Sequence, residues 1–134
     1  MSDHQMINPE ELAPAIGFSH AVVASPGRTV YFAGQTALSK DNEVTGDSLP
    51  EQFEMCLRNL RTALEGAGAE PEHLVQLQIF VTNLTDYRAK RSQLGEIWQK
   101  HLGRHYPAIA LVAVTALYDE KALVEITAIA VIPE

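Results

Sequence analysis

The sequence predicts an α+β domain in which two helices lie on one face of a β-sheet. Two long segments carry apolar residues every three or four positions, the spacing of an amphipathic helix. Shorter segments with strand-like patterns flank them, and the order along the chain is β-β-α-β-α-β-β. A chain of 134 residues has the size of one domain, so we expect a single domain over residues 1–134.

The N-terminal part predicts an irregular lead-in followed by a β-hairpin. Pro9 and Pro14 oppose regular structure over residues 1–15. Residues 19–24 and 29–35 have the composition of short strands. Because the Pro-Gly pair between them suits the centre of a type II turn, we expect these two strands to pair as a hairpin.

Both helices have recognisable ends. Ser48 and Glu51 have the spacing of a capping box, which predicts a helix start, and the glycines after residue 65 predict its end. Its buried stripe is expected to comprise Phe53, Cys56, Leu57, Leu60, Leu64 and Ala67. The second helix is expected over residues 86–102, with a buried stripe of Tyr87, Leu94, Ile97, Trp98 and Leu102.

Three further strands are expected at residues 74–82, 108–115 and 122–132. Residues 108–114 are apolar at every position, which is the pattern of a strand buried on both sides. Two helices cover only one face of a sheet, yet the last strand is also largely apolar on both faces. Another copy of the chain is the simplest cover, so we expect a homo-oligomer.

Composition and charge exclude several classes of protein. The formal net charge of −7 argues against binding to a nucleic-acid backbone. A single cysteine excludes an intramolecular disulfide and favours a reducing compartment. No signal peptide is evident, and no apolar run approaches the roughly 20 residues of a membrane span. We expect a cytoplasmic protein without a nucleic-acid or membrane partner, and without a cofactor, since no glycine-rich phosphate loop or CxxC motif is present.

Three segments carry a resemblance to a known family. They are Ala33-Gly34-Gln35, the run Pro107-Ala108-Ile109, and residues 124–130. In this order and spacing they resemble the YjgF/YER057c/UK114 family, also called the Rid (reactive intermediate deaminase) family, over nearly the whole chain. The resemblance implies a chorismate-mutase-like fold, assembled as a homotrimer with ligand clefts between neighbouring subunits.

Glu125 is the candidate catalytic residue. It lies mid-strand among apolar residues, on the face that an oligomer is expected to cover. Burial there favours a neutral carboxyl, which suits a general acid or the holder of a catalytic water. An ion pair with an Arg or Lys across an interface is the alternative. The resemblance favours the catalytic role, because family deaminases use the matching glutamate to position the hydrolytic water.

The positions expected to bind a ligand are more apolar than the family pattern. Ile109 and Leu111 stand where active deaminases of the family carry an arginine and often a cysteine, so the grip on a substrate carboxylate is missing. Arg91 and Arg104 are candidate replacements for that arginine, with solvated surface arginines as the alternative. An α-imino acid is therefore not the expected substrate.

Two further positions are expected to line the cleft. Gly34 either lets a ligand approach the backbone or marks a bulge or strand end. Phe18 either forms a pocket wall, where family members often carry a tyrosine, or packs in the core. We expect both to belong to the ligand-binding set.

No metal site and no reactive thiol are expected. His101 and His105 have a spacing that can bind a metal on a helix, but Gly103 lies between them and no Glu or Cys completes a ligand set. Cys56 fits the apolar stripe of the first helix and is expected in the core.

Three functions remain open at this point. The first is a small-molecule site in an apolar inter-subunit cleft, with Glu125 adding water to a C=N or similar electrophilic carbon. The second is a non-catalytic trimeric binding or regulatory module. The third is the endoribonuclease activity with which parts of the family are labelled, and the net charge of −7 makes it the weakest.

Overall fold

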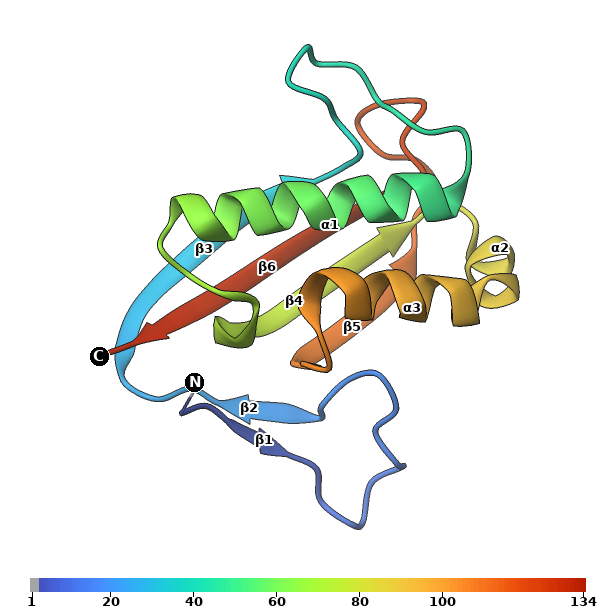
Figure 1. Cartoon of the computed structure of the whole chain (residues 1–134). Coiled ribbons are helices and arrows are strands. Elements are labelled where there is room, and N and C mark those ends of the chain that lie inside the picture. The colour runs from blue at the N-terminus through green and yellow to red at the C-terminus, as the bar shows by residue number, and fades with distance from the viewer. Residues whose placement is uncertain (1–2) are drawn as a thin grey trace.

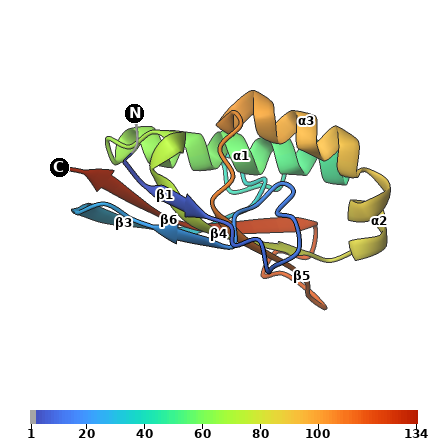
Figure 2. The ribbon, with the colours of Figure 1, turned by 90° about the horizontal axis from the view of Figure 1, so that it is seen from below.

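The computed structural model describes residues 3–134 and has an α+β architecture. A four-stranded mixed sheet has the order β3-β6-β4-β5, in which only the β4–β5 pair is parallel. The strands are β3 (Gly27–Gln35), β4 (Leu74–Val81), β5 (Ala108–Ala113) and β6 (Val124–Pro133). Helices α1 (Leu49–Gly66) and α3 (Arg91–Leu102) lie on one side of this sheet, as Figures 1 and 2 show. The expected fold class is confirmed.

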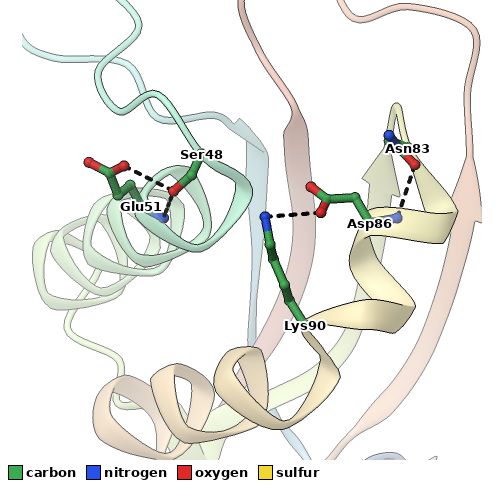
Figure 3. Close-up of polar contacts among 5 residues, drawn as sticks. All are labelled: Ser48, Glu51, Asn83, Asp86 and Lys90. Atoms are coloured by element: carbon green, nitrogen blue, oxygen red, sulfur yellow. Dashed lines mark hydrogen bonds and ion pairs between the residues drawn. The ribbon is translucent and has the colours of Figure 1, made fainter.

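Helix α1 begins where the capping box predicts. The backbone N–H of Glu51 donates to Ser48 Oγ at 3.3 Å, and the Ser48 hydroxyl donates to Glu51 Oε1 at 2.9 Å (Figure 3). The glutamate therefore reaches the serine side chain rather than its backbone, which is a variant of the usual reciprocal box. The buried stripe of α1 packs on the helix-facing side of β6 and β4, forming a core of Leu, Ile, Val, Phe and Trp side chains.

The second predicted helix is divided into two. Helix α2 (Leu84–Ala89) begins earlier than expected, because the side chain of Asn83 accepts the N–H of Asp86 at 3.0 Å and caps it (Figure 3). Lys90, at φ −109° and ψ 16°, leaves helical geometry, and α3 starts at the next residue. Apolar spacing could not reveal this break, because the stripe continues across it.

The predicted N-terminal hairpin is wrong. Residues Ala21–Val23 form β2, which pairs antiparallel with β1 (Gln5–Ile7) in a separate two-stranded ribbon, whereas β3 pairs with β6. The lead-in over residues 1–15 is thus not irregular throughout, since it contains β1; its residues 1 and 2 lie outside the described part. The ribbon lies beside the end of the sheet where β5 begins (Figure 1).

Strand β5 is an edge strand and is only partly covered within the chain. The side chain surface of Val112 is 47% exposed, so the prediction of burial on both sides fails for the single chain. Helices cover only one side of the sheet, and the other side is open (Figure 2). Among the described residues, no helix is long and apolar enough to cross a membrane.

Candidate functional site

A cavity of about 760 Å³ lies on the helix side of the sheet, against edge strand β5. Its walls come from the segment between β1 and β2, from α1, α2 and α3, and from β4 and β5. The lining comprises Ala15, Ile16, Gly17, Phe18, Phe53, Ile79, Tyr87, Arg91, Leu94, Gly95, Trp98, Tyr106, Ile109 and Leu111. Its size falls in the range of small-molecule sites, about 300–1,000 Å³.

Two aliphatic side chains from β5 line this cavity. Ile109 pairs with Leu77 and Leu111 pairs with Ile79 in the parallel β4–β5 register, and paired residues direct their side chains to the same face. Leu77 and Ile79 are buried beneath the helices, so Ile109 and Leu111 face the helices as well. Both are half-buried, and they present hydrocarbon where the resemblance implies an arginine and a cysteine.

Arg91 is the charged residue at this cavity. It is the first residue of α3, it is exposed, and no other lining residue is charged. Burial raises the pKa of Tyr87, and the nearby positive charge of Arg91 works against that rise. Arg104, the other predicted replacement, is exposed and is not among the lining residues.

Phe18 reaches the cavity from the N-terminal ribbon. Its neighbour Ser19 ties the segment to the start of β5, because the Ser19 N–H donates to Pro107 O at 2.9 Å and the hydroxyl donates to Tyr106 O at 2.7 Å. The Phe18 ring packs edge-on against the His20 ring, with centroids 5.1 Å apart. These contacts hold the aromatic ring over the cavity beside Ile109.

Glu125 and Gly34 lie together on the opposite, open face of the sheet. Glu125 pairs with Phe80 in the β4–β6 ladder, whereas the helix-facing residues of β6 are its neighbours Val124 and Ile126. A register shift occurs in β3 just before Gln35, and a Cβ added at Gly34 would overlap the Glu125 carboxylate. Glu125 is half-buried, and within residues 3–134 it forms no ion pair.

The predicted site residues therefore form two groups within one chain. Phe18, Arg91, Ile109 and Leu111 meet in the cavity, and Gly34 and Glu125 meet across the sheet from it. Sequence reasoning missed the cavity roles of Tyr106 and of three stripe residues, which it assigned to the core: Tyr87, Leu94 and Trp98. The aromatic residues in that helix stripe were the feature of the sequence that could have indicated a ligand cavity.

The histidines and the cysteine have structural partners. His101 Nε2 lies 2.9 Å from Glu54 Oε2, whereas His105 Nε2 lies 2.8 Å from Leu74 O, so the two rings are directed to different groups. Burial lowers the pKa of His105. Burial, with a smaller contribution from the charge of Glu125, raises the pKa of the Cys56 thiol to about 12, which leaves it an unreactive core residue.

A different group has metal-compatible spacing. Ligand atoms of Glu70, Glu72 and His73 lie within 4.8 Å of one another near the short helix η1 (Pro71–His73). His73 Nδ1 already accepts the Glu70 N–H at 3.0 Å, and exposed acidic residues often gather without an ion. This trio is separate from the cavity, whose lining includes none of its members.

The fold and the cavity define a small α+β domain with a ligand-sized hollow at the free edge of its sheet. The family model described as Endoribonuclease L-PSP matches residues 8–132. The chain therefore belongs to this family, whose relatives carry the names Rid, YjgF and UK114.

Relatives and solved structures agree with this assignment. The chain is 32% identical over 127 residues to protein DfrA of Myxococcus xanthus, covering 93% of each sequence. It is 30% identical over 125 residues to a 2-iminobutanoate/2-iminopropanoate deaminase of Dermatophagoides farinae, covering 92% of this chain and 90% of that protein. The crystal structure of the Rid-family protein YyfB from Yersinia pestis matches with a TM-score of 0.88, 34% identity, and coverage of 97% of this chain and 99% of that one.

Proposed function

We propose that this protein is a homotrimer that binds a small, largely apolar molecule in clefts between its subunits. The observation that carries the proposal is the pair Ile109 and Leu111, whose aliphatic side chains line a ligand-sized cavity. An open cavity with a mainly apolar lining favours apolar ligand groups, because their burial removes apolar area from water.

A standard 2-iminopropanoate deaminase activity is not part of this proposal. The resemblance implies an arginine at position 109 in active deaminases, and the isoleucine here supplies neither charge nor hydrogen bonds. A buried carboxylate left without its partner costs on the order of 3–5 kcal/mol. That free energy corresponds to roughly two to four powers of ten in affinity.

The trimer is needed to join the two groups of site residues. Glu125 lies on the open face of the sheet, so within one chain the sheet separates its carboxylate from the cavity. A neighbouring subunit packed against the β5 edge can bring its own Glu125 and Gly34 toward this cavity. Apolar side chains on the open face, among them Tyr31, Val112 and Ile129, support such packing.

The reaction that fits such a cleft is water addition to a C=N carbon. The Glu125 carboxylate would hold the water and accept one of its protons as the oxygen bonds to carbon. Return of the proton to nitrogen gives a carbinolamine. Transfer of its hydroxyl proton to the nitrogen, by way of the carboxylate, then breaks the C–N bond as the C=O bond forms, which releases ammonia and leaves a carbonyl compound. No redox partner is needed for these steps.

A non-catalytic binding module is the second candidate. Within one chain, Glu125 and the cavity lie on opposite faces of the sheet, and nothing in residues 3–134 brings Glu125 into the cavity. This separation favours a binding role without catalysis. In that case the cleft binds a metabolite as a sensor, and Glu125 contributes to the interface between subunits.

The proposed location is the cytoplasm. A nuclease role is not proposed, because the net charge of −7 disfavours binding to a nucleic-acid backbone.

Ammonia release separates the two candidates. An amino-acid oxidase generates imines from a panel of apolar amino acids, and an amine oxidase generates carboxylate-free imines from the matching primary amines. Ammonia formation is followed with and without this protein. The enzymatic role predicts acceleration that Glu125→Gln removes, whereas Thr62→Ala on the exposed side of α1 leaves the rate unchanged. Release no faster than in buffer across the panel would contradict catalysis and leave the binding module.

A reversion tests the role given to Ile109. If the remaining machinery is intact, Ile109→Arg should raise the rate with iminopropanoate above that of the unmodified protein, because the carboxylate then has a partner. Rapid turnover of iminopropanoate by the unmodified protein would refute the proposed change of substrate.

A further inference from the structure

We propose that the cavity selects an anionic molecule with a ring-sized apolar body, and that Arg91 binds its charged group. This inference rests on the proposed function, in which the cavity is the ligand site. It adds the chemical class of the ligand, its orientation, and the residue that discriminates for charge.

The lining of the cavity is rich in aromatic side chains. The Trp98 and Tyr106 rings are stacked, with centroids 6.2 Å apart and planes 10° from parallel. Their polar ends are engaged by the protein, since Trp98 Nε1 donates to His105 O at 3.2 Å and Tyr106 Oη accepts from Gln99 Nε2 at 3.0 Å. With Phe18 and Tyr87 also in the lining, the walls suit a flat, apolar ligand body.

Arg91 has no partner of its own among the described residues. Its neighbour Lys90 forms an ion pair, because Lys90 Nζ lies 2.9 Å from Asp86 Oδ1 on α2 (Figure 3). None of the ion pairs or hydrogen bonds found within residues 3–134 involves the Arg91 side chain. An uncommitted guanidinium at the edge of an apolar cavity can give its fork of donors to a carboxylate, sulfonate or phosphate.

The charge distribution also singles out this region. The chain carries 17 Asp and Glu against 10 Lys and Arg, yet residues 88–91 include Arg88, Lys90 and Arg91. An anion approaching this acidic protein therefore meets a local concentration of positive charge beside the cavity. Arg91 is the member of this group that lines it.

The position of Arg91 fixes the orientation of the ligand. Ile109 and Leu111 on β5 form an apolar floor, and the exposed Arg91 stands at the start of α3. A ligand would lay its hydrocarbon body on the floor and turn its anionic group toward the solvent-exposed side of the cavity. The family resemblance implies a cation on β5 at position 109. In this protein the cation would instead be Arg91 on α3.

A matched pair of fluorescent probes tests this inference. Anilinonaphthalene sulfonate and phenylnaphthylamine share one aromatic body, and only the former carries an anionic group. Arg91→Gln should weaken binding of the sulfonate probe by about tenfold, the effect of losing charge-assisted hydrogen bonds, and change the neutral probe little. Arg104→Gln, outside the cavity lining, is the charge-matched control and should leave both affinities unchanged. Arg88→Gln removes only part of the surrounding positive charge and should weaken the sulfonate probe by much less than Arg91→Gln. Added salt should weaken only the sulfonate probe.

Cavity-filling variants distinguish failure of the inference from failure of the proposed function. Leu111→Trp should weaken both probes, and Ile109→Phe provides a second filling variant if the first does not fold. Equal sulfonate affinity in the original protein and in Arg91→Gln, with both probes lost on filling, would overturn the role of Arg91 while leaving the cavity as the ligand site. Probe binding that survives both filling variants would overturn the cavity itself.

Discussion

At the scale of single residues, the contact between Gly34 and Glu125 shows what the missing side chain in β3 makes room for. The backbone of Gly34 is not left-handed, since the glycines with positive φ are residues 17, 46, 68 and 103. The effect is one of space, because a Cβ at Gly34 would overlap the Glu125 carboxylate in its present position. An alanine would therefore require this flexible side chain to move.

A double-mutant cycle measures this contact. Because the Glu125 carboxylate ends a flexible side chain that can shift, Gly34→Ala should lower the free energy of unfolding by only about 1 kcal/mol, the lower end of the range for overpacking. In a Glu125→Ala background, the same substitution should lower it by clearly less, because the carboxylate that the new methyl group meets has been removed. Urea unfolding of the four proteins gives the coupling free energy. Equal losses in both backgrounds would mean that the two residues do not compete for this space.

Four of the residues expected to bind a ligand, Phe18, Arg91, Ile109 and Leu111, line the cavity, whereas Gly34 does not, and their binding of a ligand stays a prediction. Trp98 is buried in the core, as the helical periodicity predicts, and it also lines the cavity. Periodicity identifies the buried face of a helix but not what faces it. Separation of Glu125 from the cavity follows from strand register, which no short motif encodes.

At the scale of elements, α1 and α3 are joined by a polar cluster as well as by their apolar stripes. Glu54 on α1 lies 2.7 Å from Lys100 Nζ and 2.9 Å from His101 Nε2, both on the last turn of α3. The hydrogen bonds from Lys100 and then from His101 lower the pKa of Glu54 below its ordinary value of 4.5. Cations also suit the C-terminal end of α3, where the helix dipole is negative.

The lowered pKa of Glu54 predicts an acid sensitivity with a definite sign. Because the carboxylate is favoured in the folded state, its contribution to stability is fully present above pH 4.5 and is lost as the pH falls through the lower folded pKa. Glu54→Gln should therefore flatten the decline of the unfolding free energy below pH 4.5. Urea unfolding across this pH range measures the effect, with Glu65→Gln on the exposed part of α1 as control. Identical acid declines for Glu54→Gln and the original protein would contradict it.

Local signals predicted the helix ends better than the strand partners. The Ser48–Glu51 spacing located the start of α1, because capping depends on residues close in sequence. The type II turn predicted at Pro26-Gly27 is wrong, because Gly27 lies at the start of β3 without a positive φ and only Pro26 is at a bend. The local pattern also did not specify that β3 would pair with a strand about 100 residues later, a choice that depends on the whole sheet.

At the scale of the whole molecule, the face of the sheet opposite the helices is left uncovered by the chain. Tyr31 on this side of the molecule is 77% exposed, and β5 has a free edge for part of its length. Chains rarely leave such apolar strands uncovered, and packing by a second copy covers them without any additional segment. The sequence supported an oligomer from apolar patterning, and the uncovered face agrees with the same argument.

A charge placed on the open face should prevent this assembly. Ile129 on β6 pairs with Tyr31 across the β3–β6 ladder, and its neighbours Ala128 and Ala130 face the helices. Ile129→Lys should give monomers in place of the proposed trimer, because a lysine buried at the interface would lack a partner. Light scattering measures the mass, and Thr62→Lys on the exposed side of α1 should remain trimeric. A monomeric original protein would remove the inter-subunit cleft from the proposed function.

The division of the site by the sheet has a consequence for inheritance. If every complete site draws its cavity from one polypeptide and its carboxylate from the next, a defect in either half is not confined to the chain that bears it. A cell that produces two defective variants, one impaired at Glu125 and one at Leu111, would assemble mixed oligomers. At some of their subunit interfaces, an intact cavity from one chain would meet an intact carboxylate from the other. Such a pair of alleles would complement each other, whereas either allele alone would produce no intact site.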